Sequence, residues 1–127
     1  MSRARMSIFI YSIYLAAGGL AMAIIPNQIL ALVGHPTTSE PWVRLFGALA
    51  FVLGAKGFNY SRLEIESMFQ FDVYTRSFFA TFLLILVLIG MARPILLVWT
   101  VVDYGAALWT ALAIRADRRS AVRTAAA

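Results

Sequence analysis

The chain has no cysteine and only one histidine, His35, among its 127 residues. The lack of cysteine excludes disulfides, thiol catalysis, iron–sulfur clusters and thiolate metal sites. One histidine cannot supply both axial ligands of a bis-histidine haem. No second histidine or acidic cluster lies at ligand spacing from His35, so a metal site is not expected there. The sequence therefore predicts a protein without a cofactor.

Charged residues are scarce as well: they make up 13% of the chain, against about 25% in ordinary soluble domains, and 61% of the chain is hydrophobic. The net charge of +5 could indicate nucleic-acid binding. However, the basic residues flank apolar segments, which is the arrangement that membrane proteins show at their cytoplasmic edges. We therefore expect the protein to be embedded in a lipid bilayer and not to bind nucleic acid.

The longest apolar run covers residues 77–114 and is broken only by Arg93-Pro94 and by Asp103. One helical crossing of a bilayer needs about 20 residues, so this run is long enough for two crossings with a turn at residues 90–94. The whole sequence predicts four crossings, at about residues 7–25, 42–60, 76–91 and 94–114. We expect residues 1–127 to form one transmembrane domain, an all-α four-helix bundle with short loops.

Three segments lie outside these crossings. Residues 29–34 are too few to span and too apolar for water, which predicts a short helix at the outer interface. Residues 61–75 mix acidic and apolar side chains without a clean period, and we expect them to rest on the cytoplasmic surface. Residues 115–127 are expected to be a basic cytoplasmic tail, either a frayed helix end or disordered. The first crossing lacks a cleavage site followed by a polar mature domain, so we expect it to be retained.

The basic residues predict the orientation of the bundle. If both ends lie on one side, that side holds Arg3, Arg5, Lys56, Arg62, Arg76, Arg115, Arg118, Arg119 and Arg123. The other side holds only Arg44 and Arg93. Positive residues accumulate on the cytoplasmic side of membrane proteins. Both termini are therefore predicted to be cytoplasmic.

Asp103 is the most unusual residue and the one candidate for a catalytic role. It is the ninth residue of a span that begins at Ile95, so it lies about 13 Å along the helix, near the middle of the bilayer. A carboxyl group there is costly and is a functional candidate by default. It could serve as a proton relay, a cation site or a ligand anchor. The alternative is a neutral carboxyl group hydrogen-bonded to a residue such as Tyr14, Thr100 or Asn59.

Residues at helical spacing from Asp103 complete a candidate ligand site. Trp99, Ala106 and Thr110 share its stripe, and Tyr11, Tyr14 and Gly18 share a face of the first helix that could lie opposite. Lys56 could pair with Asp103, or could extend to the inner headgroups as lysines near helix ends do. The candidate ligand-binding residues are Trp99, Asp103, Tyr104, Tyr14 and Lys56.

Small residues recur along the second predicted helix at spacings of three and four. They are Gly47, Ala50, Gly54, Gly57 and Ser61. Such stripes allow helix backbones to approach closely in membranes. Ala17, Gly18 and Ala21 of the first helix, and Ala107 and Ala111 of the fourth, offer matching flat surfaces. This pattern indicates helix packing, since a phosphate-binding loop needs a strand–loop–helix context that is lacking here.

The order of these features resembles small bacterial four-helix membrane proteins of poorly defined function, including the DoxX-like group. The matching pieces are Arg44-Leu45-Phe46-Gly47, Arg76, and residues 102–110 with the sequence VDYGAALWT. The resemblance implies a four-helix bundle in the bacterial cytoplasmic (inner) membrane, and a place beside an oxidoreductase or transport system. It carries over no catalytic residue.

Three classes of function fit the sequence. The first is a non-catalytic accessory or scaffold subunit that packs against other membrane proteins or forms a homo-oligomer, because the chain has little chemistry and short loops. The second is a small transporter or channel in which two chains pair and Asp103 is the coupling residue. The third is a membrane enzyme for a lipid-soluble substrate, with Asp103 as general acid near Trp99, Tyr104 and Trp109.

Overall fold

The computed structural model describes residues 2–127, and all of its regular structure is helical. The helices are α1 (Arg3–Ile24), α2 (Pro26–Leu32), α3 (Pro41–Arg62), α4 (Glu66–Leu88) and α5 (Leu97–Ala126). A short 3₁₀ turn, Pro94–Leu96, leads directly into α5. The all-α prediction is confirmed. So is the helix in the first long connection, which begins at Pro26 because proline suits the first turn of a helix.

Three helical segments are long and apolar enough to cross a membrane: Arg3–Ile24, Glu66–Leu88 and Pro94–Ala126. Helix α3 has 22 residues but is less apolar than these, since it carries Arg44, Lys56 and Asn59. The turn predicted at residues 90–94 is present. Gly90 adopts φ +79°, a left-handed conformation that ends α4 and that glycine adopts without strain.

One predicted boundary was wrong. Helix α4 begins at Glu66, so most of the connection expected on the surface at residues 61–75 is helical. Its buried residues Phe69, Arg76 and Ala80 do follow a helical period, but a buried arginine hides that period in the sequence. The tail is also helical, since α5 continues to Ala126 through alanines and arginines, which are strong helix formers.

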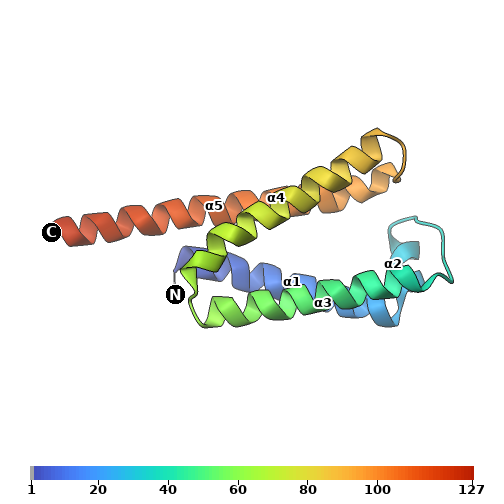
Figure 1. Cartoon of the computed structure of the whole chain (residues 1–127), viewed down its shortest axis with the longest axis horizontal. Helices are drawn as coiled ribbons and strands as arrows, with labels where there is room; N and C mark the ends of the chain where they lie inside the picture. The colour runs from blue at the N-terminus through green and yellow to red at the C-terminus, as the bar shows by residue number, and fades with distance from the viewer. Residues whose placement is uncertain (1) are drawn as a thin grey trace.

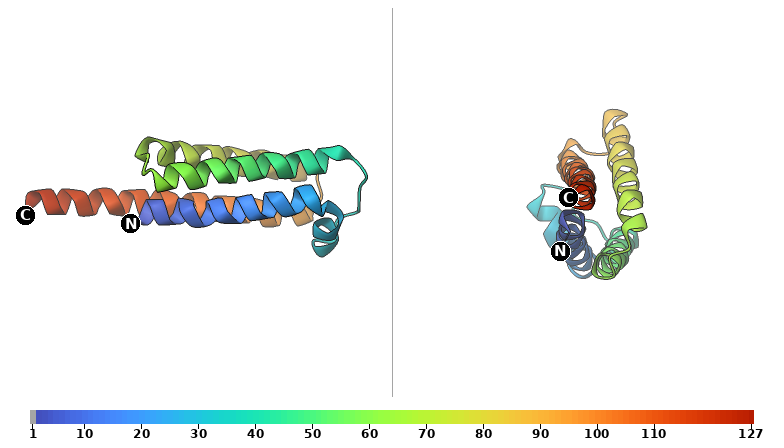
Figure 2. Two further views of the ribbon diagram at one scale, coloured as in Figure 1. Left: turned by 90° about the horizontal axis from the view of Figure 1, so that it is seen from below. Right: turned by 90° about the vertical axis from the view of Figure 1, so that its left-hand side faces the viewer.

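The helices form two antiparallel pairs, α1 with α3 and α4 with α5, and α1 also packs against α5 (Figure 1). Both termini and the α3–α4 connection lie toward one end of the bundle, which we call the terminal end (Figure 2). Helix α2 and the turn at Gly90 lie at the opposite end, where the two pairs diverge. The last part of α5 projects beyond the bundle.

Helices α1 and α3 touch through their backbones. All five predicted small residues of α3 are buried. A Cβ added at Gly54 would lie 2.5 Å from the backbone nitrogen of Ala16, and one added at Gly47 would lie 2.7 Å from the carbonyl oxygen of Gly19. On α1 the contact face therefore includes Ala16 and Gly19. The predicted flat surface around Gly18 is not that face, since nothing lies within 4 Å of a Cβ built there.

Neighbouring helices cap both ends of α1. The Asp117 carboxylate of α5 accepts hydrogen bonds from the backbone N–H groups of Arg3 (3.2 Å) and Ala4 (2.9 Å). The Arg44 guanidinium of α3 donates to the carbonyl oxygens of Ala23 (2.7 Å) and Ile24 (2.9 Å). These groups have no partners inside a helix, and each charge also has the favourable sign for the helix dipole. The two caps fix how far α1 slides against its neighbours.

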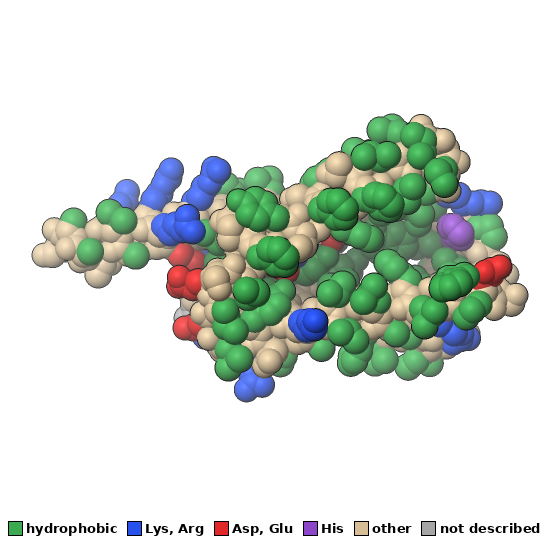
Figure 3. Space-filling model, viewed as in Figure 1, with side chains coloured by type: hydrophobic (Ala, Val, Ile, Leu, Met, Phe, Trp, Pro, Cys, Tyr) green, Lys and Arg blue, Asp and Glu red, His purple; other side chains and the backbone are tan. Residues whose placement is uncertain are grey.

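Most large apolar side chains point outward. Residues such as Trp42, Phe78, Leu88 and Met91 are at least two-thirds exposed, and apolar atoms spread over most of the visible surface (Figure 3). The buried apolar cluster is small and consists of Ala4, Ile8, Phe69 and Ala113, with Tyr60 and Ile114 against it. The interior also holds the small residues of the α1–α3 contact and a set of buried polar side chains.

Candidate functional site: a buried polar cluster

Asp103 lies in the first third of α5 and is 5% exposed. Its carboxylate accepts a hydrogen bond from the Tyr11 hydroxyl of α1. Of the partners expected from the sequence, Asn59 is exposed and Tyr14 is 45% exposed. Thr100 is buried one turn away, but its Oγ1 has no hydrogen-bond partner within residues 2–127. A tyrosine of the predicted face does bind Asp103, and it is Tyr11.

The same Tyr11 side chain contacts a buried cation. The Arg76 guanidinium of α4 is centred 3.6 Å from the Tyr11 ring centroid, which is a cation–π contact. Arg76 is 5% exposed and forms an ion pair with Asp72, one helical turn earlier. Tyr11 therefore connects α1 to α4 through its ring and to α5 through its hydroxyl.

Hydroxyl groups extend the cluster to α3. The Tyr60 hydroxyl donates to Asp72 Oδ1 at 3.0 Å. Thr110 of α5 donates to the carbonyl oxygen of Ala106, and its Oγ1 lies 3.0 Å from Ser7 Oγ and 3.5 Å from Arg76 Nη1. We call these residues the polar cluster. Its members are Ser7, Tyr11, Tyr60, Asp72, Arg76, Asp103 and Thr110.

The polar cluster has one more carboxyl group than it has cations. It holds one cation, Arg76, and two carboxyl groups, Asp72 and Asp103. An unpaired ion would be very costly among buried side chains, so the ion pair and the hydrogen bonds are what make this burial tolerable. Side chains from all four long helices meet here. The cluster is thus the main polar connection between the α1–α3 pair and the α4–α5 pair.

The other predicted site residues lie elsewhere. Lys56 is exposed and forms no ion pair with Asp103 in the part of the chain that the structure describes. The Tyr14 ring lies tilted against the Tyr11 ring, with ring centroids 5.9 Å apart. Tyr104 shares a hydrogen bond with Thr81 of α4. Trp99 is half-buried one turn before Asp103.

Sequence reasoning missed Arg76, Asp72 and Tyr60. Arg76 was assigned to the cytoplasmic edge because basic residues near span ends usually lie there. The available signal was the spacing of four between Asp72 and Arg76, which allows an ion pair along one helix face. Arg76 is buried and no longer counts as a residue of the cytoplasmic edge. Eight of the nine basic residues predicted for that edge remain, and the opposite edge has two, Arg44 and Arg93.

The carboxyl groups of the polar cluster are engaged with other side chains. No group of three or more histidine, aspartate or glutamate residues that could hold a metal ion occurs within residues 2–127. Asp103 and Asp72 each bind a tyrosine hydroxyl, so both carboxyl groups already have partners. Chemically, the cluster can hold helices together, and it can hold or release a proton.

Comparison with protein-family models, curated proteins and solved structures finds no match for this chain.

Proposed function

We propose that this chain is a four-helix integral membrane protein without catalytic activity, an accessory or scaffold subunit that packs against other membrane helices. One observation carries the proposal. The buried polar groups are directed at one another, whereas the large apolar side chains are directed outward. Bilayer hydrocarbon accepts such a surface, and it requires polar groups to be satisfied inside the protein.

The arrangement of the ends supports this proposal. Both termini lie toward one end, as an even number of crossings requires (Figure 2). Eight of the remaining basic residues belong to that end, which favours a cytoplasmic position for it. The bacterial inner membrane, and the likeness to the DoxX-like group, are part of the same proposal and depend on the sequence resemblance.

The open side of the bundle between α3 and α4 is the surface we assign to the partner helix. Phe46 of α3 and Phe79 of α4 stack with ring centroids 6.3 Å apart, which shows that these two faces look toward each other. Because α3 and α4 run in opposite directions, Leu49 lies one turn from this pair toward the terminal end and Phe82 one turn toward the α2 end, and these side chains are 57% and 52% exposed. The surface is hollowed between the two helix pairs near the α2 end (Figure 3). A transmembrane helix of another chain would cover these side chains.

Cysteine cross-linking tests the proposed partner surface. The natural chain has no cysteine, so single variants Leu49→Cys and Phe82→Cys carry one thiol each. In native membranes a short bifunctional cross-linker should join these variants to a second polypeptide, either another copy or a different subunit. The matched control is Val101→Cys on α5, which is 70% exposed and outside this surface.

Equal cross-linking at all three positions would mean random collisions. Absence of any cross-link, together with a monomer in mild detergent, would overturn the scaffold proposal.

A transporter or channel is the second candidate function, and one observation favours it. Polar side chains run from Tyr60 and Asp72 near the terminal end through Arg76 and Tyr11 to Asp103. In a membrane this series would reach from one surface to the middle of the bilayer, where Asp103 could couple to a proton. The scaffold proposal ranks higher because each carboxyl group of the series already has a protein partner.

A further inference from the structure

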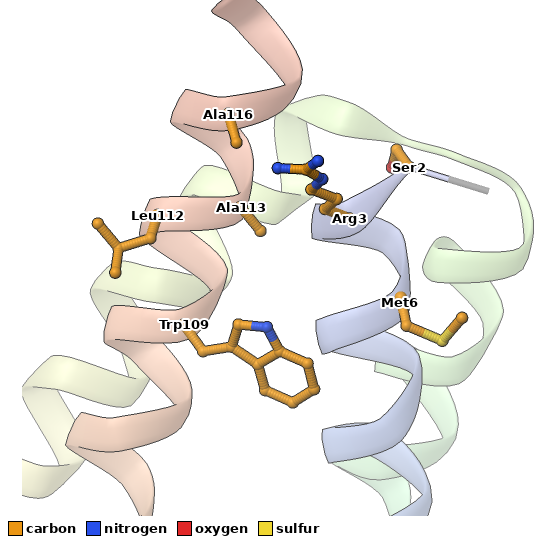
Figure 4. A pocket seen from close by; sticks show the side chains of 7 residues that line it. All are labelled: Ser2, Arg3, Met6, Trp109, Leu112, Ala113 and Ala116. Carbon is orange, nitrogen blue, oxygen red and sulfur yellow. The ribbon is translucent and has the colours of Figure 1, made fainter. Parts of the chain in front are cut away.

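A groove opens toward the terminal end between the start of α1 and the middle third of α5, and its lining includes no member of the polar cluster. It has a volume of about 480 Å³ and is open to the outside. Its lining includes Arg3 and Met6 from α1, and Trp109, Leu112 and Ala113 from α5. Figure 4 shows the Trp109 indole and the Arg3 side chain both reaching into the gap between the two helices.

The groove is apolar at one end and basic at the other. Met6 and Trp109 lie one turn further toward the centre of the bundle than Arg3 (Figure 4). On α5 the lining positions 109, 112, 113 and 116 follow the helical period, and Arg119 lies one helical turn beyond Ala116. Two arginines from different helices therefore flank the outer end of an apolar groove.

The basic residues here lack acidic partners of their own. Within residues 2–127 the salt bridges are Arg5 with Glu64 and Arg76 with Asp72. Neither Arg3 nor Arg119 takes part in one. The nearest carboxylate, Asp117, accepts hydrogen bonds from the backbone N–H groups of Arg3 and Ala4. It thereby also occupies donors that an anion at the start of α1 would otherwise use.

We propose that this groove binds one anionic phospholipid of the cytoplasmic leaflet. Arg3 and Arg119 would hold the phosphate, and an acyl chain would lie along Trp109, Met6 and Leu112. The chemistry is complementary at both ends, since arginine is the preferred partner of phosphate and the remaining surface is apolar. The proposal rests on the proposed membrane insertion, with the terminal end at the cytoplasmic surface.

Quenching of the Trp109 fluorescence by brominated lipids tests this site. The chain has three tryptophans, so the Trp42→Phe/Trp99→Phe protein reports on Trp109 alone. It is reconstituted into vesicles of phosphatidylcholine that contain a small fraction of either brominated phosphatidylglycerol or brominated phosphatidylcholine. Each basic residue near an anionic surface favours acidic lipid by roughly fivefold, so brominated phosphatidylglycerol should quench at a several-fold lower mole fraction. High salt should reduce the preference.

Two variants locate the preference. In the Arg3→Gln/Arg119→Gln variant, made in the same Trp42→Phe/Trp99→Phe protein, the two brominated lipids should quench the Trp109 fluorescence equally. The matched control Arg118→Gln, on the side of the same helix opposite the groove, should keep the preference for phosphatidylglycerol. If the control loses it as fully as the double variant does, general attraction to the basic tail explains the effect and the groove is not a site.

Three further results would contradict the lipid site. Equal quenching of the unaltered groove by the two lipids would overturn the lipid site while leaving membrane insertion intact. No quenching by either lipid would mean that Trp109 is outside the bilayer, which would overturn the proposed membrane topology itself. Relief of phosphatidylglycerol quenching by millimolar inorganic phosphate, but not by matched chloride, would assign the site to a free anion instead of a lipid.

Discussion

Tyr11 donates a hydrogen bond to Asp103 across the interface of α1 and α5, although the two residues are 92 positions apart in the sequence. The ring of the same tyrosine lies on the Arg76 guanidinium. One side chain thus satisfies a buried carboxyl group and covers a buried cation. The α1–α5 contact therefore depends on Tyr11.

Removing the Tyr11 hydroxyl should destabilise the protein. Tyr11→Phe keeps the ring over Arg76 but leaves Asp103 without its donor, which should cost about 1–3 kcal/mol. The effect should shrink when Asp103→Leu is already present, because no acceptor then remains. Thermal unfolding in mild detergent measures all four proteins of this cycle. Tyr74→Phe, at a tyrosine that is 63% exposed, is the control. Additive losses in the cycle would show that the two residues do not interact.

Replacing only one residue of the buried Asp72–Arg76 ion pair should destabilise the protein more than Tyr11→Phe does. Arg76→Gln leaves Asp72 as a buried charge without its cation, and losses of about 3–5 kcal/mol are typical of such changes. Asp72→Asn combined with Arg76→Gln removes both charges and should recover part of the loss. Arg93→Gln, in the exposed turn before α5, should change stability by no more than about 0.5 kcal/mol. A double variant no better than the single one would contradict the pairing.

The contact of α1 with α3 predicts that substitutions at Gly54 and at Gly18 will have very different effects on stability. Gly54→Ala places a methyl group 2.5 Å from the Ala16 nitrogen, so the helices must separate, at a cost of about 1–3 kcal/mol. Gly54→Leu should cost more. Gly18→Ala meets open space and should be neutral or stabilising, since alanine is the better helix former. Similar melting temperatures for Gly54→Ala and Gly18→Ala would mean that α3 does not lie against α1.

Reporter fusions test the proposed topology. The distribution of basic residues predicts a cytoplasmic signal from fusions at Ala127 and after Arg62, and an external signal near Thr38. Neutralising Arg115, Arg118 and Arg119 should weaken this orientation without preventing insertion. A cytoplasmic signal near Thr38 would remove the model with four crossings.

The fold was largely predictable, because helix formation depends on local apolar runs and on breakers such as Pro26 and the Gly90 turn. The buried stripe of α3 was predictable too, since small residues at spacings of three and four serve little else in an apolar helix. The start of α4 was not. There, Asp72 and Arg76 look like surface residues, and only the fold shows that they neutralise each other inside the bundle.

The candidate site was predicted in part. Asp103 stood out because a lone carboxyl group in an apolar helix is rare, and its burial is evident in the structure. Its partner could not be chosen, because Tyr11 and Tyr14 lie on one face and the rotation of α1 against α5 decides between them. That rotation is set by contacts between residues about a hundred positions apart, such as Asp117 with Ala4 and Ser7 with Thr110. No local pattern encodes them.

The central claim is that Asp103 holds helices together and carries no proton across the membrane. The most direct test compares proton flux in vesicles reconstituted with the natural protein and with Asp103→Asn, under an imposed pH gradient. The asparagine keeps the shape of the side chain and can still accept a hydrogen bond from Tyr11. We predict the same low flux from both proteins, with the melting temperature of Asp103→Asn unchanged or higher. A flux that the natural protein supports and Asp103→Asn abolishes, while the variant still folds, would contradict the claim and favour the transporter.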